Sequence, residues 1–252
     1  MKPACWPPLL ALLCLAGCQE DTAAAPGAAA PEADSYAGQR RAMVELQLRD
    51  RGIGDTRVLE AMGRVPRHEL VPAALRGEAY GDYPLPIGYE QTISQPYIVA
   101  FMTEALMPRA GDRVLEVGTG SGYQAAVLAE LVAEVYTIEI VEPLGLRASE
   151  DLARLGYRNV HVRIGDGYQG WPEHAPFDAI IVTCAPEAVP QPLVDQLREG
   201  GRMIIPVGEP GQGQELYLLE KRGGKVLRRA ILPVRFVPMT GEAGGGRRQP
   251  RD

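Results

Sequence analysis

A glycine-rich loop with an acidic residue before it is the part of this sequence whose spacing could bind a ligand. The loop GTGSG, residues 118–122, follows the apolar stretch RVLEV. Glycines there let the backbone turn tightly and approach a ligand without a Cβ in the way. Its G-x-G-x-G spacing lacks the third glycine position of the G-x-G-x-x-G dinucleotide fingerprint. Glu116, two residues before the first glycine, disfavours a pyrophosphate and favours a ligand that carries an amine and a sulfonium cation.

Two more acids follow the next two apolar stretches. Glu139 lies 21 residues after Gly118, about where an acid accepts hydrogen bonds from ribose hydroxyls. Asp166 comes after the third stretch, where a carboxylate can reach an adenine amino group, and Gly167 leaves room beside it. A solvated loop carboxylate or a helix cap explains each acid equally well by itself. Together with Gly118 and Gly120, they predict a site for S-adenosylmethionine rather than for NAD.

A polar segment without a catalytic base precedes the loop. Residues 90–94, EQTIS, contain Thr92 and Ser94 but no histidine or cysteine that would make either hydroxyl a nucleophile. A carboxylate that accepts a methyl group needs no base, because with a pKa of about 4 it is already ionised at neutral pH. It needs only to be oriented, and hydroxyl donors can do that. Thr92 and Ser94 are therefore interpreted as positioning donors, with Ser94 also a possible helix cap before Pro96.

Other acceptor chemistries fit the sequence less well. Enzymes that methylate exocyclic amines often carry an Asn/Asp-Pro-Pro-aromatic run after the fourth strand, where this chain has TCAP at 183–186. The three histidines, His68, His161 and His174, are dispersed in the sequence. We expect no metal site, since a catalytic metal is held by clustered ligands.

The elements that must position these residues alternate between strands and helices. This order predicts an α/β fold with a doubly wound, mostly parallel sheet whose ligand lies at the carboxyl ends of the strands. A C-terminal hairpin adds antiparallel edge strands, helices form an N-terminal extension, and residues 77–88 are expected to be loop. The predicted strands are 113–117, 134–140, 159–164, 177–183, 201–207, 215–221 and 226–234, and the predicted helices are 39–51, 56–62, 96–106, 123–131, 143–155 and 191–197.

The composition is that of a globular protein with an acidic balance. The chain has 252 residues, is 46% hydrophobic, and carries a net charge of −6. Its long-range field therefore gives no help in binding a phosphate backbone, and a nucleic-acid partner is disfavoured. We expect a monomer.

The first residues predict an exported protein. Residues 1–17 contain a short apolar run too short to span a bilayer, as in a signal peptide. They end in LAG-Cys18, which resembles the bacterial lipobox and predicts lipidation of Cys18. The alternative is a plain signal peptide in which Cys18 is incidental. The residue after Cys18 is Gln19 and not Asp, which favours anchoring in the outer membrane on the periplasmic side. If the signal is not used, the chain stays in the cytoplasm.

The remaining boundaries follow from composition. Residues 18–35 are rich in Ala, Pro and acids and predict a flexible tether, and 243–252 predict a disordered tail. Residues 36–242 are the predicted catalytic domain. In that domain Cys184 is the single cysteine, which leaves no partner for an intramolecular disulfide.

Six segments in their order resemble the protein-L-isoaspartate O-methyltransferase family. The resemblance covers about residues 36–242, and QTISQP joined to the glycine loop is its most specific part. It is carried by LPIGYEQTISQPYIVAFMTEAL (85–106), RVLEVGTGSGYQAAVLAEL (113–131), GDGYQGW (165–171), PFDAIIVT, GGRMIIPVG (200–208) and VRFVPMTG (234–241).

This resemblance implies a Rossmann-like class I fold and methylation, from S-adenosylmethionine, of the free α-carboxylate of L-isoaspartyl and often D-aspartyl residues in damaged proteins. The ester then closes to a succinimide that hydrolyses partly to aspartate. By this resemblance Ser94 matches the active-site serine, and Thr92 and Ile93 belong to the segment that contacts substrate. The implied cofactor-binding residues are Gly118, Gly120, Glu139, Asp166, Gly167 and Thr240.

Two hypotheses follow from joining this resemblance to the export signal. In the first, the chain is an exported repair methyltransferase that acts on envelope proteins and needs S-adenosylmethionine outside the cytoplasm. In the second, a tethered protein keeps the fold and binds isoaspartyl peptides or another ligand without turnover. The presence of Glu139, Asp166 and Ser94 favours the enzyme. Glu90, a negative charge near an anionic substrate, is not explained by either hypothesis.

Overall fold

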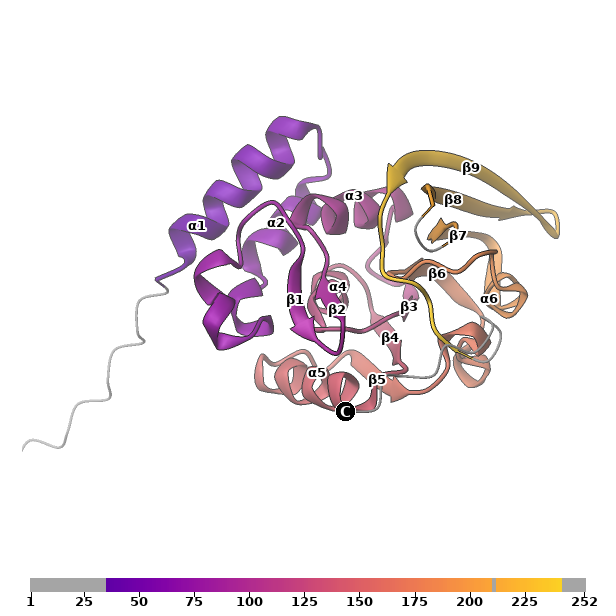
Figure 1. The fold of residues 1–252 in the computed structure, drawn as a ribbon. Coiled ribbons are helices and arrows are strands. Elements are labelled where there is room, and N and C mark those ends of the chain that lie inside the picture. Colours follow the sequence, from indigo (N-terminus) through magenta and orange to yellow (C-terminus); the bar gives the residue numbers. More distant parts are fainter. Residues whose placement is uncertain (1–34, 210–211, 242–252) are drawn as a thin grey trace, which may run out of the picture. The chain divides into compact units, whose positions relative to one another are not determined.

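A seven-stranded sheet forms the centre of the computed structural model, which describes residues 35–209 and 212–241 (Figure 1). The strands lie in the order β5-β4-β3-β6-β7-β8-β9, parallel from β5 to β7 and antiparallel at β8 and β9. The predicted α/β fold with antiparallel C-terminal edge strands is confirmed. The strands are β3 (Arg113–Val117), β4 (Glu134–Glu139), β5 (Val160–Ile164), β6 (Phe177–Val182), β7 (Leu197–Val207), β8 (Gln214–Arg222) and β9 (Lys225–Val234).

The direction in which strands are added reverses between β3 and β6. From β3 the chain adds β4 and β5 on one side, and then β6 and its successors on the other. The two strands are paired in register, with Val117 opposite Val182 at their carboxyl ends. In open α/β sheets the crevice beyond such a reversal is where ligands bind. The fold therefore places a binding site just after Val117 and Val182.

Helices cover both faces of the sheet because adjacent strand residues point to opposite faces. Val114 and Ile181 share one core with the helices that precede β5, whereas Leu115 and Ile180 share the other with α6 and η5. Every residue of β3 after Arg113 is buried, as expected for a strand covered on both sides. The helices are α1 (Ala37–Ala42), α2 (Thr56–Arg64), α3 (Pro96–Leu106), α4 (Tyr123–Ala129), α5 (Glu142–Arg154), α6 (Gln191–Gln196), and the short η3 (Arg67–Leu70), η4 (Ala73–Glu78), η5 (Gly167–Gln169) and η6 (Pro172–His174).

The predicted helix over 39–51 is divided into three parts. It runs as α1, continues as a π-helix η1 (Met43–Leu48), and closes as a 3-10 turn η2 (Arg49–Arg51). Gly52, with φ of 96°, ends it in the left-handed conformation that glycine adopts at little cost. Tertiary packing explains the difference, because the π-helix buries Met43, Val44 and Leu48 together.

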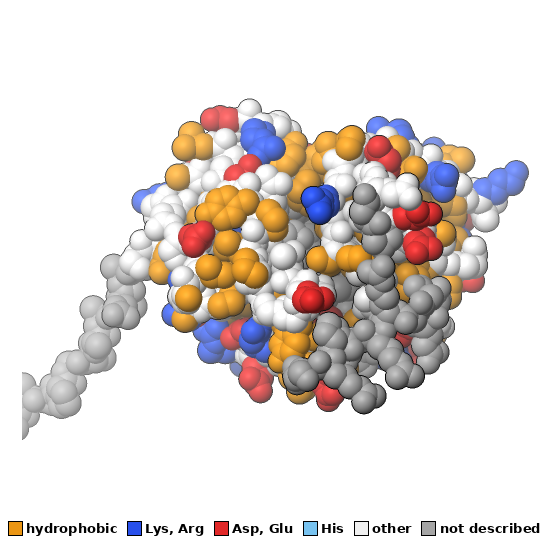
Figure 2. All heavy atoms as spheres, in the orientation of Figure 1, with side chains coloured by type: hydrophobic (Ala, Val, Ile, Leu, Met, Phe, Trp, Pro, Cys, Tyr) orange, Lys and Arg blue, Asp and Glu red, His pale blue; other side chains and the backbone are white. Residues whose placement is uncertain are grey.

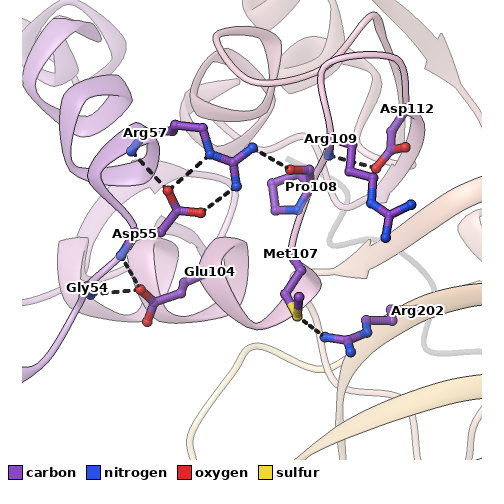
Figure 3. A network of polar contacts seen from close by, with 9 residues as sticks. All are labelled: Gly54, Asp55, Arg57, Glu104, Met107, Pro108, Arg109, Asp112 and Arg202. Atoms are coloured by element: carbon purple, nitrogen blue, oxygen red, sulfur yellow. Dashed lines mark hydrogen bonds and ion pairs between the residues drawn. The ribbon is translucent and has the colours of Figure 1, made fainter.

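A polar network joins this N-terminal part to α3 (Figure 3). Asp55 caps α2, accepting a hydrogen bond of 2.9 Å from the Arg57 backbone N–H. The Glu104 Oε1 atom accepts from the backbone N–H groups of Gly54 and Asp55 at 2.7 and 2.6 Å. Arg57 also donates to the Pro108 carbonyl at 2.9 Å. These contacts fix the start of α2 against the C-terminal end of α3.

A hairpin lies where the sequence predicts loop. β1 (Leu85–Gly88) and β2 (Gln91–Ile93) form a two-stranded antiparallel sheet in which Leu85 is opposite Ile93. The prediction of loop over residues 77–88 is thus wrong for its last four residues. The turn between the strands is Tyr89-Glu90, with φ of 53° and 57°. Hairpin turns with two positive φ values usually contain Asn-Gly or Asp-Gly. The Tyr89-Glu90 sequence therefore does not indicate a hairpin turn.

Several predicted segments lie outside the described residues. These are the signal peptide 1–17, the lipidation residue Cys18, nearly all of the tether 18–35, and the tail 243–252. Within the described ranges, no helix combines the length and apolar character needed to cross a bilayer.

Candidate active site

The glycine loop leaves β3 and enters α4 at the point where the strand order reverses. Gly118, Gly120 and Gly122 have φ of 98°, 53° and 82°. A Cβ on Gly118 would stand 2.5 Å from Thr183 Oγ1, a distance that real Cβ atoms do not adopt. The same Thr183 hydroxyl donates to the Gly118 carbonyl at 2.7 Å. Both the backbone conformation and the close approach of Thr183, directly after β6, therefore require glycine at 118.

Glu139 ends β4 and ties the loop to it. Its Oε2 atom accepts from the Gly120 N–H at 2.7 Å, and its Oε1 atom accepts from the Val141 N–H at 2.9 Å. Burial raises the pKa of this carboxyl above its ordinary value, and the hydrogen bonds from Val141 and Gly120 partly offset that effect. Each carboxyl oxygen keeps a second lone pair, which suits acceptance from a sugar hydroxyl.

Glu116 has a different place from the one predicted. It is fully buried beneath the loop, and it is not among the described residues that line the nearby cavity. Its Oε2 atom accepts from the Thr137 hydroxyl at 2.6 Å, while Oε1 is buried without a hydrogen-bond partner. Burial raises its pKa to about 8, with the nearby Glu139 charge adding to the effect. The expected contact with a cationic ligand is wrong, because a central strand buries both of its faces.

Asp166 and Gly167 follow β5 and stand at the edge of the same crevice. The Asp166 carboxylate caps η5, accepting from the Tyr168 N–H at 2.9 Å. Gly167 lines the cavity, and a Cβ there would come within 2.4 Å of Val117 Cγ1. Asp166 itself is not among the described lining residues. Its contact with adenine stays a prediction.

Two adjoining cavities open at the carboxyl ends of the strands. The first contains the predicted cofactor residues Gly118, Gly120, Glu139, Gly167 and Thr240, with Cys184 in its wall. The second has a volume of about 790 Å³ and contains Ser94. The described residues that line both cavities are Thr92, Thr183, Val237 and Pro238. These four residues therefore form the boundary between the two cavities.

The predicted substrate-binding residues Thr92, Ile93 and Ser94 lie partly at the cavities and partly in the hydrophobic core. Thr92 is exposed and Ser94 half-buried, both at the cavities. The side chain of Ile93 is 3% exposed and packs in the core, and the contact of Ile93 with substrate stays a prediction. Ser94 does not cap α3, because the N-cap is Gln95 and no side chain caps it. Ser94 is thus available to the cavity.

The far wall of the site is a segment that sequence reasoning used only through Thr240. The amide of the buried Gln214 brackets Phe236, accepting from its N–H at 2.6 Å and donating to its carbonyl at 3.2 Å. Ala185 holds the next residues by accepting from Met239 N–H and donating to Val237 O, each at 2.8 Å. The sequence analysis did not identify Thr183 or Gln214 as residues of the site. Thr183 could have been found from its position directly after β6, where the strand order reverses.

The histidines do not form a metal centre. No group of three or more His, Cys, Asp or Glu residues that could hold a metal is found in the described ranges. His161 and His174 are closer than their sequence separation suggests, since both stack on the Tyr136 ring, at 4.8 and 4.3 Å between centroids. His68 instead stacks on Tyr36. These contacts are packing.

The fold and the first cavity together define a class of protein. The cradle fits S-adenosylmethionine: glycines without room for a Cβ, an acid at the end of β4, and a second glycine after β5. Such a cradle on this sheet is that of a Rossmann-like, class I S-adenosylmethionine-dependent methyltransferase. Residues 39–244 match the profile of the Protein-L-isoaspartate(D-aspartate) O-methyltransferase (PCMT) family, and the chain belongs to that family.

Individual relatives agree with this assignment. A protein-L-isoaspartate O-methyltransferase of a Synechococcus strain is 60% identical over 212 residues, covering 82% of this chain and 87% of that protein. One from Gloeobacter violaceus is 58% identical over 200 residues, 79% of this chain and 98% of that protein. The chain is therefore an S-adenosylmethionine-dependent protein carboxyl O-methyltransferase.

Solved structures give the same result. A protein-L-isoaspartate O-methyltransferase structure superposes with a TM-score of 0.73 at 32% identity, over 80% of this chain and 66% of that one. A Plasmodium falciparum structure, described as a protein of this name in complex with S-adenosyl-L-homocysteine, gives a TM-score of 0.70 at 29% identity, over 80% and 98% of the two chains.

Proposed function

We propose that this chain is an exported, lipid-anchored repair enzyme that methylates the free α-carboxylate of L-isoaspartyl and D-aspartyl residues in envelope proteins. The observation that carries the catalytic part is the pair of adjoining cavities, one with a cofactor cradle and one whose described lining residues include hydroxyls and no general base. When bound, S-adenosylmethionine supplies an electrophilic methyl group. The acceptor carboxylate is already ionised and needs no group to take its proton.

The residues of this chain then have positioning roles. Ser94 and Thr92 orient the substrate carboxylate by donating hydrogen bonds, since both border the larger cavity. Glu139 accepts from ribose hydroxyls and fixes the loop through Gly120. Asp166 accepts from the adenine amino group, and Thr240 closes the wall of the cofactor cavity.

A labelling experiment tests the catalytic proposal. The purified chain is mixed with tritiated S-adenosylmethionine and with paired peptides that carry isoaspartate or aspartate at one position. Base-labile label on the isoaspartyl peptide alone is the expected result. Failure to bind S-adenosyl-L-homocysteine by calorimetry, or equal labelling of both peptides, would contradict it.

The proposed location rests on the sequence before the described part. The apolar run followed by LAG-Cys18 supports lipidation, and Gln19 supports the outer membrane. The test is labelling of growing cells with radioactive palmitate, followed by membrane fractionation. The full chain is expected to be labelled and membrane-bound, whereas Cys18→Ser is expected to carry no label. Unlabelled full chain in the cytoplasmic fraction would refute the location and leave the catalytic proposal standing.

A further inference from the structure

The larger cavity carries a single kind of charge. Among the described residues that line it, Arg235 is the one charged side chain. The other lining residues are hydroxyl, amide or apolar: Pro84, Thr92, Ser94, Gln95, Ile98, Thr183, Pro233, Val234, Phe236, Val237 and Pro238. A cleft lined by one sign of charge concentrates ligands of the opposite sign. The cavity therefore favours an anion.

Arg235 is placed where it can meet an incoming ligand. It is exposed, and within the described ranges no hydrogen bond or ion pair engages its guanidinium. Asp82, whose carbonyl accepts from the cavity-lining Gln95, has its carboxylate paired with Arg51. The backbone just after Arg235 is held by Gln214, whose amide makes two hydrogen bonds to Phe236. Figure 2 shows Lys and Arg side chains interspersed among hydrophobic and uncharged ones on the face that it draws.

The chemistry of the reaction limits what this cation can do. Methyl transfer joins an anionic oxygen to the carbon of a cationic methyl donor, and both charges disappear. A cation paired tightly with the attacking oxygen would stabilise the reactants more than the transition state and slow the reaction. A cation at the rim instead raises the local concentration of the anionic substrate. The neutral hydroxyls of Thr92 and Ser94 suit the reacting carboxylate itself.

We propose that Arg235 captures the substrate by attracting the negative charge of the isoaspartyl carboxylate at the cavity rim, and that it sets KM rather than kcat. This proposal rests on the proposed function. It makes Arg235 a specificity residue for anionic substrate, separate from the hydroxyls that orient the acceptor oxygen.

The test compares four forms of the full chain: unaltered, Arg235→Gln, Arg235→Lys and Arg229→Gln. Arg229 is an exposed arginine on β9 outside the lining of both cavities, so it controls for the loss of one positive charge. Initial rates on an isoaspartyl peptide are measured at low and high salt, and binding of S-adenosyl-L-homocysteine is measured by calorimetry. Arg235→Gln is expected to raise KM about 3- to 10-fold with kcat little changed. Its kcat/KM is also expected to fall less steeply with added salt.

Arg235→Lys keeps the charge and is expected to keep most of the affinity. The proposal is overturned if Arg235→Gln changes KM no more than Arg229→Gln does, if the salt dependence stays that of the unaltered chain, or if the loss falls on kcat. Loss of S-adenosyl-L-homocysteine binding in Arg235→Gln would also overturn it, since that would place Arg235 in the cofactor site. Absence of turnover by the unaltered chain would refute the proposed function instead, so the two failures are distinguishable.

Discussion

Replacing the buried Glu116 by glutamine is expected to change how the stability of this protein depends on pH. Glu116 is fully buried in the central strand β3, and its pKa in the folded protein is raised to about 8 from an ordinary value of 4.5. Between these values the unfolded chain holds the carboxylate and the folded chain holds the neutral acid. Folding therefore takes up a proton, and the free energy of unfolding falls as the pH rises.

The size of the effect follows from that difference. The Glu116 contribution is fully present below about pH 4.5 and is lost as the pH rises toward 8. The loss is about 1.4 kcal/mol per pH unit, or about 3 kcal/mol between pH 5 and pH 7. In Glu116→Gln the amide oxygen can still accept from the Thr137 hydroxyl. The amide nitrogen then lies where Oε1 has no partner, which costs about 1–3 kcal/mol at every pH.

Urea denaturation at pH 5, 6, 7 and 8 measures this directly. The difference in unfolding free energy between Glu116→Gln and the unaltered chain is expected to shift in favour of the variant by about 3 kcal/mol from pH 5 to pH 7. Glu150→Gln, on the exposed side of α5, is the matched control and is expected to leave the pH dependence unchanged. Parallel stability curves for Glu116→Gln and the unaltered chain would refute the reasoning.

Four further changes test the site and the fold. Ser94→Ala is expected to lower kcat on the order of 10-fold or more while sparing the calorimetric affinity for S-adenosyl-L-homocysteine, and Asp166→Ala is expected to do the reverse. Equal effects on both quantities would count against these roles. Glu104→Ala leaves two backbone N–H groups without their acceptor and is expected to lower the unfolding free energy by about 2 kcal/mol in urea denaturation, against Glu150→Ala as control. Glu90 has a positive φ at the hairpin turn, and glycine adopts this conformation at lower cost. Glu90→Gly is therefore expected to raise the free energy of unfolding by up to about 1 kcal/mol in the same assay. A decrease would mean that the Glu90 side chain makes stabilising contacts.

The parts of the fold that were predicted correctly are those with local signals. β3 could be recognised because a strand buried on both faces reads as a short apolar run. α3 matches its predicted range because Pro96 fixes its first turn. The glycine loop could be placed because a strand, the glycines and a helix follow one another directly between residues 113 and 129. Each of these signals depends on near neighbours in the chain.

The parts that were missed depend on distant contacts. The β1–β2 hairpin has no turn signature, and Arg147 of α5 supports it by donating to the Ile87 carbonyl at 2.6 Å. The hairpin turn also explains the position of Glu90, the negative charge that the sequence analysis left unexplained. Glu90 is exposed at this turn and is not among the described residues that line either cavity. Gln214 could not be found from its neighbours, because its two hydrogen bonds join it to a residue 22 positions away.

In the proposed reaction the methyl group crosses the wall shared by the two cavities, and the described residues of that wall are uncharged. The residues shared by the two cavities, Thr92, Thr183, Val237 and Pro238, are all uncharged. Charged side chains lie in one cavity or the other: Glu139 lines the first and Arg235 the second. Because transfer converts two opposite charges into neutral products, a formal charge at the shared wall would stabilise one reactant and lose that stabilisation in the transition state. Neutral hydroxyls can hold the acceptor oxygen without that loss, and an ionised carboxylate needs no base, so hydroxyls at the shared wall suit carboxyl methylation.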